Sequence, residues 1–230
     1  MASETINLLS SMATRDVLAE LAGQYQQASG CQVVPESAGG VDVARRVLAG
    51  EAVDVVVLAA KAIDELIRAG RLVADSRVDI VKSGIAIAVR AGADAPDITS
   101  PEAVKKAVLD APTLSYSTGP SGVYLEALFA RWGIFEQIRS RIVQAPPGVP
   151  VGSLVARGDV ALGFQQLSEL MHLPGIVVLG PLPEAIQSIT TFTGAVSTGS
   201  AQADNARGIL AFMTAPDAAH AIRRQGMEPA

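Results

Sequence analysis

Short apolar runs alternate with longer amphipathic stretches along almost the whole chain. Several of these runs are apolar at nearly every position, which is typical of strands buried on both faces of a sheet. The segments with strand character are residues 5–10, 31–37, 53–59, 84–90, 113–117, 141–145, 160–164, 175–180 and 190–197.

In the stretches between them, apolar residues recur every three or four positions, which predicts amphipathic α-helices. The predicted buried faces consist of Val17, Leu18, Leu21, Ala22 and Tyr25; Val43, Val47 and Leu48; Ile63, Leu66 and Ile67; Leu125, Leu128, Phe129 and Trp132; and Ile209, Leu210, Phe212 and Met213. This βαβα order predicts an α/β fold with mostly parallel sheets.

Two long extended stretches, residues 79–97 and 183–199, interrupt the alternation. If the chain crosses between two lobes at both places, residues 1–82 with 190–230 form lobe one, and residues 83–189 form lobe two. Two hinge crossings of this kind would place a ligand cleft between the lobes.

Hydroxyl, glycine and amide residues follow the predicted strands where helices begin. They are Ser10 and Ser11 after the first run, Ser37, Gly39 and Gly40 after the second, Ser117, Thr118, Gly119 and Ser121 after residues 113–117, and Gln165 and Gln166 after residues 160–164. The first turn of a helix has unpaired N–H groups and the positive end of its dipole, so several such starts together can bind an anion. Each alone is an ordinary helix cap. The predicted anion site therefore rests on their convergence.

Two cations lie close to these positions. Arg15 falls in the first helical turn, and Lys61 follows the run 53–59. Either one reaches a carboxylate of the ligand or is a solvated surface charge, and we include both in the predicted ligand site.

Other kinds of site fit the sequence poorly. Gly122 is followed by Val123 where a P-loop has lysine. His172 and His220, the chain's two histidines, are interpreted as capping, packing or surface groups. The single cysteine, Cys31, excludes an internal disulfide and a multi-cysteine metal site, and we expect it to be buried. No cofactor or metal is predicted.

Composition limits the partners and the location. The net charge is -5, aromatic residues are 4%, and no basic block is present, so nucleic acid is a poor candidate. No apolar run approaches the roughly 20 residues of a membrane span. The first residues lack the basic and apolar regions of a secretory signal, so the sequence as written predicts a cytoplasmic protein. A periplasmic location is the alternative if a signal was removed.

Four segments of the chain resemble the molybdate-binding proteins of ABC transporters, which belong to the type II periplasmic-binding-protein superfamily. They are residues 6–72, the motif SYSTGPSGVYLEAL (115–128), the motif SLVARGDVALGFQQLSEL (153–170) and residues 194–229. The resemblance implies two α/β lobes that grip an oxyanion with serine hydroxyls, backbone N–H groups and a tyrosine. Ser11 is similar to the first-loop serine, and Ser117–Ser121 match the third loop in kind. Gly40 or Val41 stands where the family has a second serine, and Gln166 stands where it has the tyrosine. These differences favour a larger, planar anion such as a di- or tricarboxylate.

Three functions remain open. The first is a receptor that binds a small anion and, if exported, serves an ABC permease. The second is an isomerase of an unsaturated tricarboxylate, because aconitate isomerase is similar to the molybdate-binding proteins; its proton carriers would come from serines, threonines, Tyr116, Tyr124 or Lys61. The third is a cytoplasmic small-molecule sensor.

Overall fold

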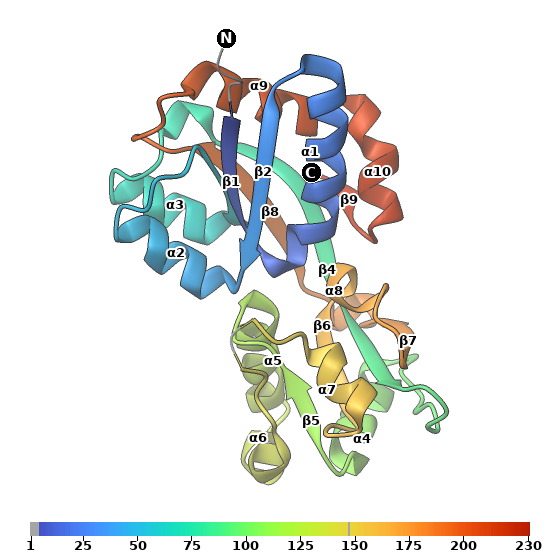
Figure 1. Ribbon diagram of the computed structural model, residues 1–230. Helices are drawn as coiled ribbons and strands as arrows, with labels where there is room; N and C mark the ends of the chain where they lie inside the picture. Colours follow the sequence, from blue (N-terminus) through green and yellow to red (C-terminus); the bar gives the residue numbers. More distant parts are fainter. Residues whose placement is uncertain (1–4, 147) are drawn as a thin grey trace. The chain divides into compact units, whose positions relative to one another are not determined.

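The computed structural model describes residues 5–146 and 148–230, which form two compact units. Unit one contains the described residues up to Ser83 together with Thr190–Ala230, and unit two is Gly84–Ile189. The chain passes from one unit to the other within strand β4 (Val78–Arg90) and at the start of β8 (Ile189–Val196) (Figure 1).

Unit one is built on a mixed sheet with the strand order β2-β1-β3-β8-β4. Strand β1 (Thr5–Ser11) pairs in parallel with both β2 (Gln32–Ala38) and β3 (Val55–Ala59). Strand β8 runs antiparallel to β3, and the short β9 (Glu228–Pro229) runs antiparallel to β4. The parallel pairs therefore lie at the β2-β1-β3 end of the sheet.

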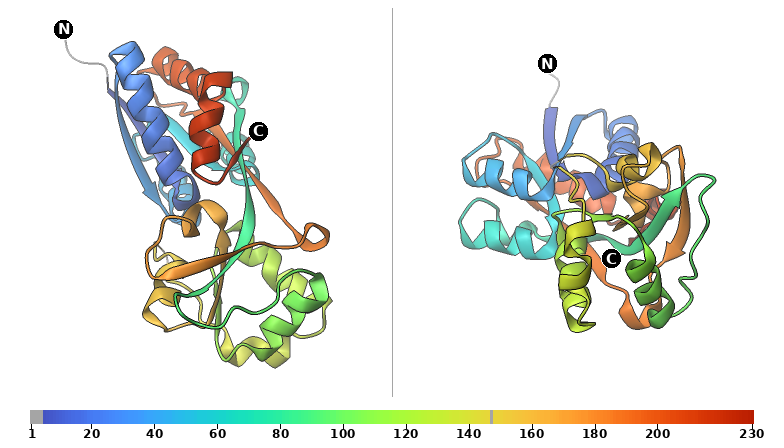
Figure 2. Two further views of the ribbon diagram at one scale, coloured as in Figure 1. Left: turned by 90° about the vertical axis from the view of Figure 1, so that its right-hand side faces the viewer. Right: turned by 90° about the horizontal axis from the view of Figure 1, so that it is seen from below.

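Helices cover both faces of this sheet. Helices α1 (Arg15–Ser29), α9 (Ala203–Met213) and α10 (Ala219–Arg224) share a core with Ile6, Leu8 and Val55. Helices α2 (Gly40–Leu48) and α3 (Ala60–Arg68) share a second core with Leu9 and Val56. Figures 1 and 2 show α1 in blue beside the red C-terminal helices. Because successive strand residues point to opposite faces, both faces need apolar residues, which explains the continuously apolar runs.

Unit two has a smaller mixed sheet. Strand β6 (Leu162–Gln166) is parallel to β5 (Leu114–Tyr116) and antiparallel to β4, and β7 (Ile176–Pro181) is antiparallel to β4. Its helices are α4 (Pro101–Asp110), α5 (Pro120–Arg131), α6 (Phe135–Ile138), α7 (Val151–Arg157) and α8 (Leu167–Leu170). The rings of Tyr116 and Phe164 lie 6.2 and 6.1 Å from that of Phe129 in the core.

Single turns of 3-10 helix connect several of these elements. They are η1 (Met12–Thr14), η2 (Ala74–Ser76), η3 (Arg139–Arg141), η4 (Glu184–Ile186) and η5 (Pro216–Ala218). Within the described part of the chain, no helix has the length and apolar character needed to cross a membrane.

Most of the predicted elements are present, with one clear exception. Residues 141–145 were expected to form a strand, but they make one isolated bridge, between Ile142 and Leu114. Val143 donates its N–H to the Leu114 oxygen at 2.8 Å, and the Arg141 side chain donates to the backbone oxygens of Leu109 and Ala111 at 2.8 and 2.5 Å. The strand prediction was wrong because the run makes a single bridge to β5 rather than a continuous ladder.

Two smaller expectations have opposite outcomes. Cys31 is buried in the core of unit one, as predicted. Leu48, assigned to the buried face of α2, is 47% exposed because it is the last residue of that helix.

Two glycines should respond in opposite ways to substitution by alanine. Gly23 lies inside α1 with nothing within 4 Å of an added Cβ, so Gly23→Ala should stabilise the chain by ~0.5–1 kcal/mol. At Gly194 in β8 an added Cβ would lie 2.5 Å from Leu210 and 2.9 Å from Ile80, so Gly194→Ala should cost about 1–3 kcal/mol. Thermal unfolding of both variants checks this pair. A Gly194→Ala chain as stable as wild type would show that the two side chains can move aside.

Candidate functional site

The carboxyl ends of β2, β1 and β3 lie side by side in unit one, since these neighbours are parallel and in register. Helical turns start directly after each: η1 after Ser11, α2 after Gly39 and α3 after Ala59. A Cβ atom built on Gly40 would lie 3.8 Å from the Cβ of Ser11, so the first two of these starts adjoin. The structure therefore brings Ser11, Gly39 and Gly40 together, and their contact with a ligand stays a prediction.

The starts of α2 and α3 have no side-chain cap. Neither Gly39 nor Ala59 caps its helix with a side chain, whereas Ser100 accepts the Ala103 N–H at 3.1 Å at the start of α4. The first N–H groups of a helix have no partner inside the helix. Those of α2 and α3 are thus hydrogen-bond donors at the positive end of a helix dipole.

The serines at this edge of the sheet differ in their hydrogen-bond partners and in their exposure. Ser10 is fully buried, and its Oγ lies 2.8 Å from the Oγ of Ser37. Ser11 is 7% exposed, and its Oγ lies 3.4 Å from the Oγ1 of Thr14. Thr14 in turn donates to the backbone oxygen of Ser11 at 3.1 Å. The Ser10 hydroxyl thus joins β1 to β2, and Ser11 and the half-buried Ser37 are nearer to solvent.

Arg15 and Lys61, the two cations of the predicted site, differ in their surroundings. Arg15 pairs with its neighbour Asp16, Nε to Oδ1, at 2.8 Å, and its side chain is half exposed. Lys61 is exposed in the first turn of α3, directly after the end of β3. Lys61 is therefore the better placed of the two for an anion at this edge.

In unit two, the loop after β5 is folded tightly around its hydroxyls. Ser117 Oγ accepts the N–H of Gly119 at 3.3 Å and lies 3.3 Å from the Oγ of Ser121. Thr118 is exposed, and α5 begins at Pro120 without a side-chain cap from Gly119. An added Cβ at Gly122 would lie only 1.7 Å from the carbonyl oxygen of Ser117. Gly122 is therefore the residue that lets this loop form, and the sequence pattern did not assign it that role.

The loop after β6 lies beside the loop after β5, because Phe164 is aligned with Tyr116 in a parallel pair. Gln165 uses both ends of its amide inside unit two: Oε1 accepts the Val151 N–H at 2.8 Å, and Nε2 donates to Glu169 at 2.7 Å. Gln166 is 2% exposed at the residue before α8. Gln165 thus links α7 to α8, and a contact with ligand stays a prediction for both glutamines.

The tyrosines considered as proton carriers and the two histidines lie in other surroundings. Tyr116 is a core residue that donates to Glu126 at 3.2 Å, and burial, followed by the nearby carboxylate, raises its pKa. Tyr124 donates to the backbone oxygen of Ile186 at 2.9 Å. His172 and His220 are both exposed. Across residues 5–146 and 148–230, no cluster of His, Cys, Asp and Glu could hold a metal ion.

Comparison with known proteins gives consistent likenesses. Residues 6–228 match the family described as bacterial extracellular solute-binding protein. The chain is 37% identical to an aconitate isomerase of Pseudomonas sp over 231 residues, covering 98% of this chain and 88% of that protein. The periplasmic molybdate-binding protein of Azotobacter vinelandii has a TM-score of 0.80 at 20% identity, covering 96% of this chain and 98% of that one. PEB3 with L-phospholactate bound has a TM-score of 0.75 at 13% identity, covering 97% and 99%.

These likenesses confirm the predicted resemblance and the predicted α/β fold class. The expectation of mostly parallel sheets was wrong, because β8 runs antiparallel to β3 and β4 runs antiparallel to β6, β7 and β9, which makes both sheets mixed. The structural likenesses, at low sequence identity, speak for the fold alone.

Gly122→Ala should disrupt the loop after β5, because the added carbon must displace the Ser117 carbonyl. We expect a loss of about 1–3 kcal/mol in the free energy of unfolding, as for other overpacked sites. The matched control is Val123→Ala, one residue away and 67% exposed, which should change stability by less than about 0.5 kcal/mol. Urea unfolding followed by circular dichroism compares them. Equal stability of the two variants would contradict the tight loop.

Proposed function

Because this chain belongs to the family of bacterial extracellular solute-binding proteins, we propose that it binds a small anion, and specifically a di- or tricarboxylate. The observation that carries the proposal is the set of uncapped helix starts at strand ends: α2 and α3 in unit one and α5 in unit two. The proposed ligand-binding residues are Ser10, Ser11, Arg15, Ser37, Gly39, Gly40, Lys61, Ser117, Thr118, Gly119, Ser121, Gln165 and Gln166.

The choice of a carboxylate follows from the chemistry of the donors. Backbone N–H groups and hydroxyls form strong, charge-assisted bonds with carboxylate oxygens. Val41 and Val123 lie in the first turns of α2 and α5 and are each 67% exposed. Apolar side chains at these positions suit a ligand with a carbon skeleton better than a compact oxyanion such as molybdate.

A second candidate function is isomerisation of an unsaturated tricarboxylate, and the 37% identity to an aconitate isomerase favours it. Such a reaction moves one proton: a base removes it from the carbon next to the double bond, and an acid returns it at the far end of the allylic system. Charge that develops at the two ends of the allylic system, and on the carboxylates attached there, would be stabilised by N–H groups at helix starts. Lys61 is the proposed proton carrier, because Tyr116 and Tyr124 already donate within unit two.

Receptor and isomerase differ in what else they require. A receptor would deliver its ligand to an ABC permease and would work in the periplasm, whereas an isomerase or a sensor can act without either. The genes beside this one, for a permease and an ATPase or for catabolic enzymes, would favour one version over the other.

Binding is tested by thermal unfolding with cis-aconitate, trans-aconitate, citrate, succinate, molybdate, tungstate and sulfate. The true ligand should raise the melting temperature, since it binds the folded chain. We expect the tricarboxylates to give the largest rise. A rise with molybdate or tungstate and none with the carboxylates would contradict the proposed ligand class.

The donors themselves are tested by Ser11→Ala and Thr118→Ala. Each should weaken binding of the identified ligand by about 1 kcal/mol, roughly fivefold, because one hydrogen bond to a charged group is lost. Ser140→Ala, an exposed serine in η3, is the matched control and should bind as wild type does. Unchanged affinity in both test variants, measured by titration calorimetry, would place the site elsewhere.

Isomerase activity is tested by incubating the chain with trans-aconitate and following the absorbance and proton resonances of the two isomers. Formation of cis-aconitate, with deuterium incorporated from heavy water, is the expected result for the second candidate. A flat trace together with confirmed binding would remove the isomerase and leave the receptor or the sensor.

A further inference from the structure

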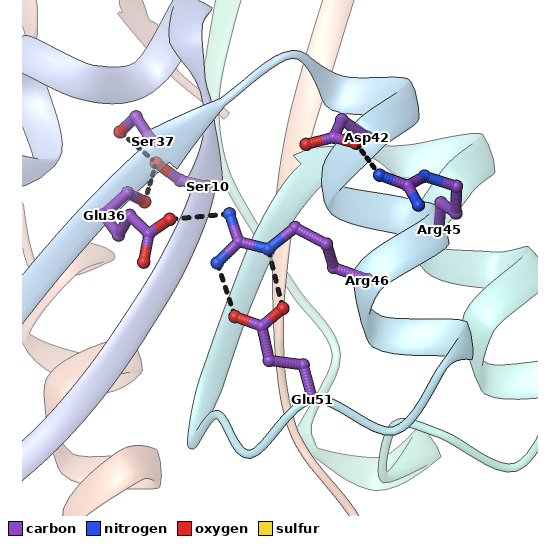
Figure 3. A network of polar contacts seen from close by, with 7 residues as sticks. All are labelled: Ser10, Glu36, Ser37, Asp42, Arg45, Arg46 and Glu51. Atoms are coloured by element: carbon purple, nitrogen blue, oxygen red, sulfur yellow. Dashed lines mark hydrogen bonds and ion pairs between the residues drawn. The ribbon is translucent and has the colours of Figure 1, made fainter.

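The Ser10–Ser37 hydroxyl pair is part of a polar network that begins on helix α2 (Figure 3). The two serines are aligned in β1 and β2, and their Oγ atoms lie 2.8 Å apart. Ser10 also donates to the backbone oxygen of Glu36 at 3.4 Å. The position of Glu36 therefore affects where this pair lies.

Arg46, on α2, binds the side chain of that same glutamate. Its Nη1 donates to Glu36 Oε1 at 2.6 Å, while its Nε donates to Glu51 Oε2 at 2.7 Å and its Nη2 to Glu51 Oε1. One guanidinium thus connects α2, β2 and the segment after α2, as Figure 3 shows. A planar guanidinium with several fixed donors holds its partners in a defined direction, which lysine cannot do.

The charge of Arg46 is already matched by these partners. The hydrogen bond with Glu51, followed by that with Glu36, raises the pKa of Arg46. In the same way, the hydrogen bond from Arg46 lowers the pKa of Glu51. The side chain of Arg46 is 21% exposed, which is little for an arginine on a surface helix. Its role is therefore better described as holding the strand end than as binding a ligand.

We propose that Arg46 is a positioning residue for the anion-binding loop of unit one, acting through Glu36 on the Ser10–Ser37 pair beside the start of α2. The inference rests on the proposed function, because it concerns the same donors. Exposed ion pairs add little to stability, so a pair with Glu36, whose side chain is 59% exposed, is not explained well by stability alone.

The preceding residue provides a matched control. Arg45 lies on the same helix and pairs with Asp42 within α2 alone, and its side chain is 76% exposed (Figure 3). Arg45→Gln removes the same charge as Arg46→Gln and leaves the Ser10–Ser37 pair untouched.

The experiment measures the affinity of the full chain for trans-aconitate by titration calorimetry, and its melting temperature without ligand. Arg46→Gln should weaken binding about fivefold or more, as expected for contacting residues in one network. Arg46→Lys should restore part of the loss, and Glu36→Gln should reproduce it. Arg45→Gln should bind within about twofold of wild type, as expected for an exposed surface substitution.

A double variant separates positioning from a general structural effect. If Arg46 acts through the serine pair, Arg46→Gln and Ser10→Ala together should weaken binding no more than the worse of the two alone. A merely structural role would lower the melting temperature and leave the affinity of the folded chain unchanged. Additive losses, or wild-type affinity in Arg46→Gln, would overturn the proposal. A wild-type chain that binds none of the anions tested would remove the proposed function and this inference with it.

Discussion

Parallel pairing of β1 with β2 and β3 is the constraint on which the proposed site in unit one depends. Parallel neighbours end at the same edge, and each strand is followed at once by a helical turn. Helix starts, with their unpaired N–H groups, are therefore gathered by the topology of the sheet rather than by any one motif. The same rule acts on a smaller scale in unit two, where β5 and β6 are the parallel pair.

Helix starts without a side-chain cap are found both at the candidate site and away from it, for example at α9 and α10. Ser100 caps α4, and Gln165 accepts the first N–H of α7, whereas α2, α3 and α5 begin after Gly39, Ala59 and Gly119. A side-chain cap stabilises a helix by about 1 kcal/mol, so its omission lowers stability. A missing cap therefore points to a ligand only where several helix starts meet at one edge of a sheet, as those of η1, α2 and α3 do.

Much of the fold could be predicted from the sequence, because burial on one or both faces leaves a period in the apolar residues. The core positions Val17, Leu18 and Leu21 and the buried strand β3 follow directly from that period. Residues 141–145 show the limit of prediction from apolar runs. This run has the apolar character of a strand, yet it makes only one bridge, and Arg141 ties it to Leu109 and Ala111.

The placement of the candidate residues was predictable in outline and not in detail. Serines and glycines at strand ends are visible in the sequence, but the pairing of Ser10 with Ser37 depends on the register of two strands. The internal bonds of Gln165 depend on how α7 packs, and the role of Gly122 depends on a carbonyl five residues earlier. Long-range contacts of this kind leave no local pattern.

Backbone amide resonances test most directly whether uncapped helix starts bind the anion. We expect trans-aconitate to shift the amide signals of Gly40 and Ser121, which lie in the first turns of α2 and α5, and to leave Ala103 unchanged. Ala103 is the reference because its N–H is already bound by Ser100. Unmoved Gly40 and Ser121 signals in the presence of a bound tricarboxylate would contradict binding at the uncapped helix starts.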